Sequence, residues 1–473
     1  MKNLKQILQF NKLLVILGIF IFIYIIFFTK IIKYSSKYDI KEEYVTGIIT
    51  SMKLDGNKLT INIKARENII ANYYIQTEEE KNSIFNTFHL GCKVYLRGSF
   101  SKPLDNTVPN TFNYKRYLYN KKIYYIFNIS EYKIIKSNNL IYKLKDNLFK
   151  KIYNSENSDY YLAFILGDKA LLSSDIYDAY QKNGISHLLA ISGMHINMLV
   201  LLISKIIKSE KKEFFATSVF LLLYLFLTGI TASIMRAIIF YILKKINKLK
   251  KLRYSNMHIL ILSAYLILLI DPFMIYDLGF IYSFVVCFGI IYYTDYIKGN
   301  YFIKLLKLSI ITFVFSLPVT ALVNFEVNLL SILINIIFVP WVSLFLYPFI
   351  LISFIFPVLN PILNFFISFT NIFNIFLGKF SLLINIPKMP IIFVVLFYII
   401  LLTKKKKNIY FLILIVVACK LLPLLDFNYY VYYLDVGQGD SSLLISPHNK
   451  ETIMIDTGGK VEYKLADWKK KKK

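Results

Sequence analysis

Acidic residues and cysteines are scarce in this chain, and each scarcity excludes a class of protein. The 473 residues include 29 Asp and Glu against 56 Lys and Arg, which gives a net charge of +27. The three cysteines, Cys92, Cys287 and Cys419, are far apart and form no C-x-x-C pair. The spacing therefore supports neither a disulfide framework nor a thiolate zinc site, and we expect Cys287 and Cys419 to be packing residues.

Histidine is rare as well, and its distribution argues against a hydrolytic metal centre. The chain has five histidines, His89, His187, His195, His258 and His448. Zinc hydrolases need several His and Asp ligands close together, and only His448 accompanies the aspartates near the C-terminus. We therefore predict no metal site, no cofactor and no catalytic residue in this chain.

Apolar residues, in contrast, are abundant and are arranged in long uncharged runs. They make up 56% of the chain, and the mean hydropathy is +0.52. Uncharged runs cover residues 183–204, 214–235, 278–294, 308–325, 327–378 and 389–403. This composition predicts a polytopic α-helical membrane protein. The run 327–378 is too long for one span, and "FPVLNP" (356–361) is the expected break.

Composition changes along the chain predict five regions. Residues 1–38 form a first membrane helix and its flanks. Residues 39–137 form a small all-β domain, since "KLDGNKLTINIKA" (53–65) places Asp55-Gly56 between two alternating runs, as in a β-hairpin. A barrel and a sandwich both remain open for this domain. Residues 138–182 form a helical connecting segment, 183–425 a multi-span domain, and 426–473 the beginning of an α/β fragment.

The basic excess has two readings at this stage. Lysines that flank membrane spans on the cytoplasmic side would produce it, and so would a polyanionic substrate such as nucleic acid. The densest short clusters are "KKINKLKKLR" (244–253) and "KKKK" (404–407), which we place in the cytoplasm. The fragment 426–473 is then extracytoplasmic, and we expect the β domain to be so too.

The stretch "HLLAISGMHI" (187–196) places polar residues inside an uncharged run of membrane length. Polar side chains at membrane depth are costly and are usually retained for function. Ser192-Gly193 predicts a kink or an unwound turn whose backbone lines a cavity. The alternative is that His187 and His195 lie at the interface while Ser192 bonds to its own helix.

Two further segments carry polar residues at a membrane boundary. In "LTGITASIMRAIIF" (227–240), Arg236 must either face a partner or water, or extend to the interface near Lys244. In "DPFMIYDLGFIYSF" (271–284), Asp271 and Asp277 are expected to cap helices. Glu326 separates two uncharged runs without a loop, which suggests a re-entrant or broken helix.

Taken together, these segments resemble the ComEC family of DNA-uptake channel proteins. "LAFILGDKALLSSDIYDAYQKNGISHLLAISGMHI" (162–196) resembles the membrane-domain signature of that family, and the two segments above resemble its next motifs. "LDVGQGDSSLL" and "MIDTGG" are similar to the start of its metallo-β-lactamase-like domain. The residues that carry the channel signature are Gly167, Asp168, His187, Ser192, Gly193, His195, Thr228, Gly229, Arg236 and Asp271.

The resemblance implies transport of one strand of DNA across the cytoplasmic membrane during natural transformation. It also implies an extracytoplasmic OB-like domain that meets DNA, a DNA receptor, and a cytoplasmic ATP-driven translocase, while oligomeric state is left open. Candidates for DNA contact are Tyr95, Arg97, Phe100, Tyr114, Lys115 and Tyr117.

The sequence departs from the family at its C-terminus and leaves two alternatives. The chain stops shortly after Gly459, in a lysine run, before the family's His-x-His-x-Asp-His region, so we expect the β-lactamase-like domain to be truncated and its nuclease centre to be missing. The alternatives to transport are an intramembrane hydrolase that uses Ser192 with His187 or His195, and a transport-inactive remnant.

Overall fold

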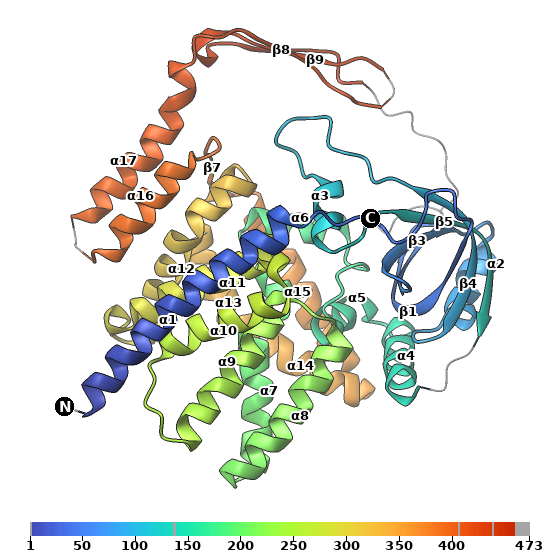
Figure 1. The fold of residues 1–473 in the computed structure, drawn as a ribbon, viewed down its shortest axis with the longest axis horizontal. Coiled ribbons are helices and arrows are strands. Elements are labelled where there is room, and N and C mark those ends of the chain that lie inside the picture. The colour runs from blue at the N-terminus through green and yellow to red at the C-terminus, as the bar shows by residue number, and fades with distance from the viewer. Residues whose placement is uncertain (1, 136–138, 405–406, 438, 459–473) are drawn as a thin grey trace.

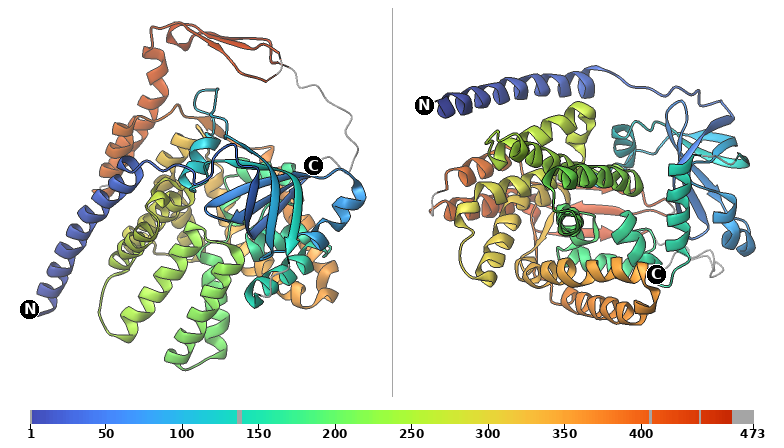
Figure 2. Two further views of the ribbon diagram at one scale, coloured as in Figure 1. Left: turned by 45° about the vertical axis from the view of Figure 1, so that its right-hand side comes forward. Right: turned by 90° about the horizontal axis from the view of Figure 1, so that it is seen from below.

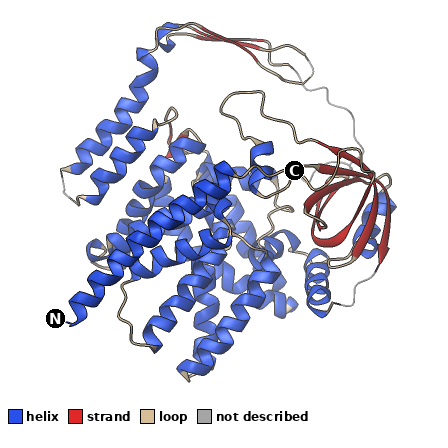
Figure 3. Ribbon diagram, in the orientation of Figure 1, coloured by secondary structure: helices blue, strands red, loops and turns tan. Residues whose placement is uncertain are grey.

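Helices make up most of this computed structural model, which describes residues 2–135, 139–404, 407–437 and 439–458 (Figures 1 and 3). A small closed barrel lies at one side of the helical bundle, and a three-stranded sheet lies near the C-terminus. Gly459, the final lysine run and the predicted domain boundary at residue 137 lie outside the described residues.

The first element is a long apolar helix that leads into the barrel. Helix α1 (Lys2–Ile26) continues into the π-helical turn η1 (Phe27–Ile31). Residues Asn11–Ile31 are long and apolar enough to cross a membrane, as the sequence predicts for this region.

The β domain is a closed five-stranded barrel, which resolves the choice between barrel and sandwich. Its strands follow the order β1-β2-β3-β5-β4, with β3 and β5 parallel and the other pairs antiparallel. The strands are β1 (Tyr44–Asp55), β2 (Lys58–Lys64), β3 (Asn68–Tyr74), β4 (Lys93–Ser101) and β5 (Ile126–Ile135). The predicted hairpin is confirmed, because Asp55 pairs with Lys58, and Leu59, Ile61 and Ile63 are buried on one face. Two helices in this region were not predicted, α2 (Glu78–Thr87) and α3 (Tyr114–Asn120).

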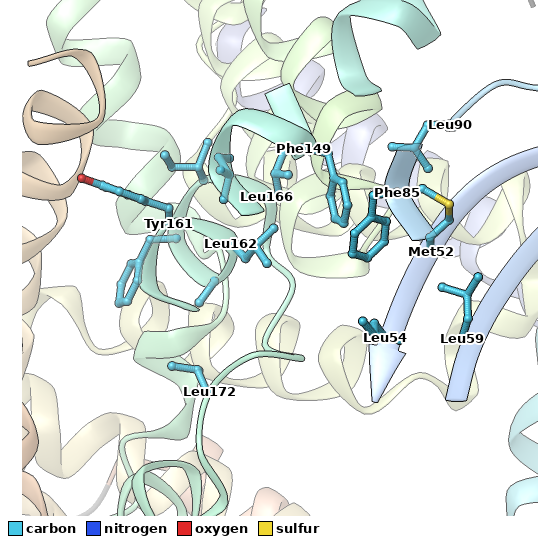
Figure 4. Packing of buried hydrophobic residues seen from close by; sticks show 14 of the residues in the cluster. Met52, Leu54, Leu59, Phe85, Leu90, Phe149, Tyr161, Leu162, Leu166 and Leu172 are labelled. Carbon is cyan, nitrogen blue, oxygen red and sulfur yellow. The ribbon is translucent and has the colours of Figure 1, made fainter. Parts of the chain in front are cut away.

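Short helices join the barrel to the bundle. They are α4 (Leu140–Tyr153), α5 (Ser158–Tyr161), η2 (Leu162–Leu166) and α6 (Ser174–Lys182). The rings of Phe85 in α2 and Phe149 in α4 lie 5.3 Å apart between centroids, in one apolar cluster that reaches from the barrel to η2 (Figure 4). The buried carboxylate of Asp146 in α4 accepts the Leu90 backbone N–H at 2.8 Å. The barrel is therefore packed onto α4 and does not hang from a free linker.

The bundle is built from helices of unequal length. They are η3 (Ser186–Leu189), α7 (Gly193–Ile206), α8 (Glu210–Thr228), α9 (Ala232–Leu249), α10 (Asn256–Ile270), η4 (Pro272–Tyr276), α11 (Leu278–Tyr292), η5 (Thr294–Tyr296), α12 (Tyr301–Val323), α13 (Ser331–Pro340), η6 (Trp341–Leu346), α14 (Tyr347–Ile355), η7 (Pro357–Leu359), α15 (Asn360–Gly378), α16 (Ile391–Leu402) and α17 (Asn408–Leu421). Within the described residues, five helical stretches have the length and hydropathy to cross a membrane: Asn11–Ile31, Tyr301–Val323, Ser331–Ile355, Pro357–Gly378 and Asn408–Leu425. Four shorter helices are also apolar, namely α7, α10, α11 and α16.

Three predicted features of the uncharged runs can be compared with the structure. The run 183–204 is not a single span, because Asn183 and Gly184 end α6 and the chain passes through η3 before α7 begins at Gly193. The predicted break in the run 327–378 is confirmed, since η7 separates α14 from α15 there. Glu326 begins β6 (Glu326–Asn328), which pairs with β7 (Leu383–Asn385) and so interrupts the helices with a two-stranded sheet.

The cluster at residues 244–253 and the described lysines Lys404 and Lys407 lie at one end of the bundle, and the barrel lies at the other. His258 Nε2, near the start of α10, is 2.7 Å from Asn11 Oδ1 in α1, while Thr29 and Tyr276 meet at 3.2 Å at the opposite ends of these helices. Lys404 Nζ donates to the Tyr292 carbonyl oxygen at 2.7 Å, at the end of α11 that is remote from η4. Figure 2 shows α1 running alongside the bundle towards the barrel.

The C-terminal segment forms strands, as its sequence predicts. Strands β8 (Tyr430–Tyr433), β9 (Ser442–Ile445) and β10 (Thr452–Ile455) make an antiparallel sheet in the order β10-β9-β8. The turns η8 (Leu422–Leu425) and η9 (Pro447–Asn449) flank β8 and β9. This sheet lies beyond α17, above the bundle in Figure 1, whereas the barrel lies to the right of the bundle.

Candidate functional site

The Ser-Gly pair of the signature begins helix α7 and does not lie within a helix. The His195 Nδ1 atom accepts the Ser192 backbone N–H at 3.1 Å and is also 3.1 Å from Ser192 Oγ. Ser192 is thus the N-cap of α7, and the side chain of His195 satisfies its backbone donor. Because that donor can only give its proton, Nδ1 is unprotonated and the neutral ring carries its proton on Nε2.

The same arrangement occurs at the start of α10. There, His258 Nδ1 accepts the Ser255 backbone N–H at 3.3 Å and is 3.0 Å from Ser255 Oγ. Two helices of the bundle thus begin with a Ser-x-x-His capping box. The contact between Ser192 and His195 therefore has a structural explanation that requires no nucleophile and base.

The two signature histidines have different surroundings. His195 is 1% exposed, and its ring packs edge-on against Tyr347, with centroids 4.4 Å apart. Its Nε2 atom is buried without a hydrogen-bond partner among the described residues. His187 is exposed on η3, and within the described chain no hydrogen bond joins it to Ser192 or His195. The two histidines therefore differ in exposure and do not form a hydrogen-bonded pair.

Gly193 and Arg236 do meet, at the wall of a cleft. A Cβ atom on Gly193 would lie 2.9 Å from Arg236 Nη2, so the guanidinium lies directly against the first turn of α7. Arg236 Nη1 donates to Cys287 Sγ at 2.7 Å. All three residues line a cleft of about 980 Å³ between α7, α9, α10 and α11. The predicted unwound turn with its backbone on a cavity is thus present at Gly193, and Arg236 faces partners and does not extend to Lys244.

Four other signature residues occupy helix ends. Gly167 and Gly229 have φ of +75° and +86° at the ends of η2 and α8, a backbone region that favours glycine. Thr228 Oγ1 donates to the Tyr224 carbonyl oxygen at 2.8 Å. Asp168 Oδ1 accepts the Ala170 backbone N–H at 2.9 Å, and burial raises the pKa of its carboxyl group above the ordinary value.

Asp271 connects the bundle to the segment that follows β4 of the barrel. As predicted, it caps a helical turn, since its side chain accepts the Phe273 backbone N–H at 3.3 Å, and Asp277 caps α11 in the same way through Phe280 at 2.9 Å. Asp271 Oδ1 also lies 3.4 Å from Lys122 Nζ, just beyond α3. This ion pair lies where the end of α3 meets η4.

The candidate DNA-contact residues on strand β4 differ in accessibility. Tyr95 is 41% exposed, with Lys93 Nζ 5.4 Å from its ring centroid. Arg97 is paired with Glu43 at 3.7 Å and Glu131 at 3.5 Å, so its charge is already partly compensated. Phe100 is 7% exposed and packs against Phe127 in the barrel core, so it offers no ring to a base and is withdrawn as a candidate.

The remaining candidates lie on α3. The rings of Tyr114 and Tyr117 are stacked at an interplanar angle of 22°, and both residues are exposed. Lys121 Nζ lies 4.4 Å from the centroid of Tyr117, while Lys115 pairs with Asp105 at 3.2 Å. This short helix therefore presents two exposed aromatic rings with a cation beside them.

Sequence reasoning missed two residues of the cleft. Phe240 follows Arg236 by one helical turn and lines the same cleft, a relationship that the helical period could have revealed. Cys287 was expected to be a packing residue, but it contacts Arg236 from a different helix, and no local pattern predicts that contact. Across the residues that the structure describes, no three His, Cys, Asp or Glu side chains gather as a metal site would require.

Comparison with known proteins gives one family and three relatives. The family model described as Competence protein matches residues 164–404. ComE operon protein 3 of Bacillus subtilis (strain 168) is 26% identical over 468 residues, which cover 91% of this chain and 60% of that protein. The chain thus spans less than two thirds of the length of this relative.

Two shorter relatives come from mycoplasmas. Protein MG316 of Mycoplasma genitalium is 30% identical over 210 residues, which cover 44% of this chain and 54% of that protein. Its homologue in Mycoplasma pneumoniae is 29% identical over 184 residues, which cover 38% of this chain and 47% of that protein.

Proposed function

Because this chain belongs to the Competence protein family, we propose that it carries one strand of DNA across the cytoplasmic membrane during natural transformation. The name of the Bacillus relative supports a role in competence. The candidate membrane-spanning helices support a multi-pass membrane protein. A charged, hydrated polymer cannot enter bare hydrocarbon, so its route must be lined by polar groups or by backbone.

One observation carries the proposal. The uncharged run 183–204 is interrupted by a turn, and the residue that follows the turn, Gly193, lies with Arg236 on the wall of a cleft inside the bundle. Irregular backbone at membrane depth is tolerated where it lines a cavity. An interrupted helix with an arginine beside it is therefore what a route for an anionic polymer requires.

The barrel is proposed to receive the strand on the extracytoplasmic side. Its strand order and its single parallel pair agree with an OB-like barrel, a fold that binds oligonucleotides. Tyr95, Tyr114 and Tyr117 are exposed and are the rings that remain available for base stacking. Through the ion pair between Lys122 and Asp271, this surface contacts the membrane domain.

The lysine-rich end is proposed to face the cytoplasm, as the positive-inside rule favours. Partners at that end would include an ATP-driven translocase, and a DNA receptor would deliver the strand to the barrel. Transport without hydrolysis is the proposed role of the chain, because the repeated capping box at Ser192 and Ser255 gives the Ser-His contact a structural purpose.

Uptake of labelled DNA tests this function. Deletion of the gene should abolish entry of labelled DNA into the cytoplasm while DNA still binds the cell surface, and the chain supplied in trans should restore entry. Unchanged uptake after deletion would refute the proposal. Failure of the chain to restore uptake lost on deletion, although it reaches the membrane, would instead favour a transport-inactive remnant.

A further inference from the structure

The cleft between α7, α9, α10 and α11 has a strongly asymmetric charge. Its lining residues include six cations: Arg236, Lys244, Lys245, Lys248, Lys251 and Arg253. No Asp or Glu is among the lining residues that the structure describes. A cleft with cations on its walls and no acid raises the local concentration of anions.

Two of the six cations are neutralised from outside the cleft. Lys245 Nζ lies 2.5 Å from Glu213 Oε2, and Lys248 Nζ lies 2.5 Å from Glu210 Oε1. Within the described residues no ion pair is formed by Arg236, Lys244, Lys251 or Arg253. The Nε atom of Arg236 is in addition buried without a hydrogen-bond partner. An anion in the cleft would therefore find uncompensated charge.

The cleft-lining residues of α9 follow the helical period. Arg236, Phe240 and Lys244 recur at a spacing of four residues, so they lie on one face of the helix, and Lys251 follows in the connection after α9 ends at Leu249. From Arg236 to Lys244 the helix rises about 12 Å, at about 1.5 Å for each residue. The cations therefore form a row along the cleft, with the ring of Phe240 between the first two.

We propose that this face of α9 binds the phosphodiester backbone of single-stranded nucleic acid, with Phe240 as a stacking surface for one base. The inference rests on the proposed function for the identity of the polymer. A positively charged groove with interleaved aromatic rings is how proteins hold single strands without reading their sequence. The row is longer than a single phosphate group needs, which favours a polymer over one lipid headgroup.

Topology alone explains only part of this arrangement. Lys251 and Arg253 lie in the connection between α9 and α10, where a cytoplasmic loop would carry positive charge without any ligand. Arg236 lies in the second turn of α9, at the inner end of the cleft beside Gly193, and membrane orientation gives no reason for a cation there. The inner end is therefore the part of the row that a polyanion explains best.

Cys287 provides a reporter at that inner end. It lines the cleft, whereas Cys92 and Cys419 are buried elsewhere. In the purified full-length chain that carries Cys92→Ala and Cys419→Ala, a negatively charged thiol reagent should modify Cys287 faster than a positively charged reagent of the same size. An unlabelled oligo-dT strand should slow this modification, and the protection should weaken as salt is added.

Variants then assign the protection to α9 and to the connection that follows it. Arg236→Gln, Lys244→Gln and Lys251→Gln should each lower the slope of log affinity against log salt by about 0.7, the value for one phosphate contact of a single strand. Phe240→Leu should weaken binding by about tenfold without a change in that slope. The matched control is Lys298→Gln, which removes an exposed lysine at the same end of the bundle but outside the cleft, and it should change neither quantity.

The outcomes separate this inference from the proposed function. Absence of oligo-dT protection at Cys287, in a protein that still supports DNA uptake, would overturn the site and leave the function standing. Protection by vesicles of anionic lipid but not by oligo-dT would also overturn it, in favour of a lipid headgroup. Protection by oligo-dT in neutral-lipid nanodiscs, weakened in Arg236→Gln and unchanged in Lys298→Gln, is the expected result.

Discussion

Gly193 and Arg236 are in such close contact that a single methyl group on the glycine would fall 2.9 Å from the arginine Nη2 atom. Gly193 is the first residue of α7, and Arg236 lies in the second turn of α9. A methyl group at this position would therefore require the guanidinium to move, and the contact brings two segments of the signature to one point of the cleft wall.

Gly193→Ala should displace the guanidinium of Arg236 and reduce DNA uptake. The clash involves the far end of a flexible side chain, which can move. The free energy of unfolding should therefore fall by less than the roughly 1–3 kcal/mol that is typical of an overpacked core position. Uptake of labelled DNA and thermal unfolding in detergent measure the two effects separately. The control is Gly378→Ala, whose Cβ would approach no closer than 4.0 Å to any neighbour. Wild-type uptake in Gly193→Ala would show that the position of the guanidinium does not matter.

Asp168→Asn should stabilise the protein at neutral pH. Burial raises the pKa of Asp168, so its ionised form is disfavoured in the folded state, and an amide keeps the hydrogen bond from Ala170 without the charge. As the pH falls from neutral through the raised pKa towards the ordinary value of 3.8, the carboxyl group is protonated in the folded state first and the advantage of the variant should vanish.

Thermal unfolding measured from neutral to acidic pH tests whether Asp168→Asn is more stable than the wild type only where the carboxyl group is ionised. Asp105→Asn is the control, because a hydrogen bond from Lys115 lowers the pKa of Asp105, and its loss should not stabilise the protein at neutral pH. A lower midpoint for Asp168→Asn than for the wild type at neutral pH would contradict the burial argument.

Ser192→Ala distinguishes a helix cap from a nucleophile. Removal of the hydroxyl leaves the backbone N–H of Ser192 bonded to His195, so stability should fall by about 1 kcal/mol and DNA uptake should persist. Ser255→Ala removes the equivalent hydroxyl at α10 and should behave in the same way. Loss of a hydrolytic activity of the purified protein in Ser192→Ala alone, with normal folding, would revive the hydrolase alternative.

The ion pair between Lys122 and Asp271 should contribute little to stability. The side chains are 45% and 28% exposed, and such pairs are typically worth about 0.2–1 kcal/mol. A double-mutant cycle with Lys122→Gln and Asp271→Asn measures this coupling, and the amide retains the cap on η4. A coupling of several kcal/mol would mean that the pair is the main attachment of α3 to the membrane domain.

The sequence predicted those turns, breaks and caps that are determined by residues close together in the chain. The hairpin at Asp55-Gly56, the break at Pro357 and the caps at Asp271 and Asp277 all depend on residues within a few positions of one another. The run 183–204 was misread because its uncharged composition hides the turn at Asn183. The Asn183 side chain donates to the Asn374 carbonyl oxygen at 2.7 Å, a contact with a helix nearly 200 positions away that no local pattern contains.

In the candidate site, too, the local motifs could be predicted but the contacts between distant segments could not. The motifs that contain Gly193 and Arg236 were both recognised, but their contact depends on how α7 packs against α9. Phe100 is buried and Tyr95 is exposed because their side chains lie on opposite sides of the barrel wall. The alternation of residues along a strand indicates these sides only when the register is known. Cys287 joins the site from α11 through its hydrogen bond with Arg236, which depends on how the helices pack.

The most direct test of transport through this bundle is crosslinking of DNA during import. A photoreactive amino acid in place of Phe240 should crosslink to labelled donor DNA in cells that are taking it up, whereas the same replacement of Leu222, which is 56% exposed on α8, should not. Equal crosslinking at both positions, or none at Phe240 while DNA enters the cytoplasm, would contradict a route along α9.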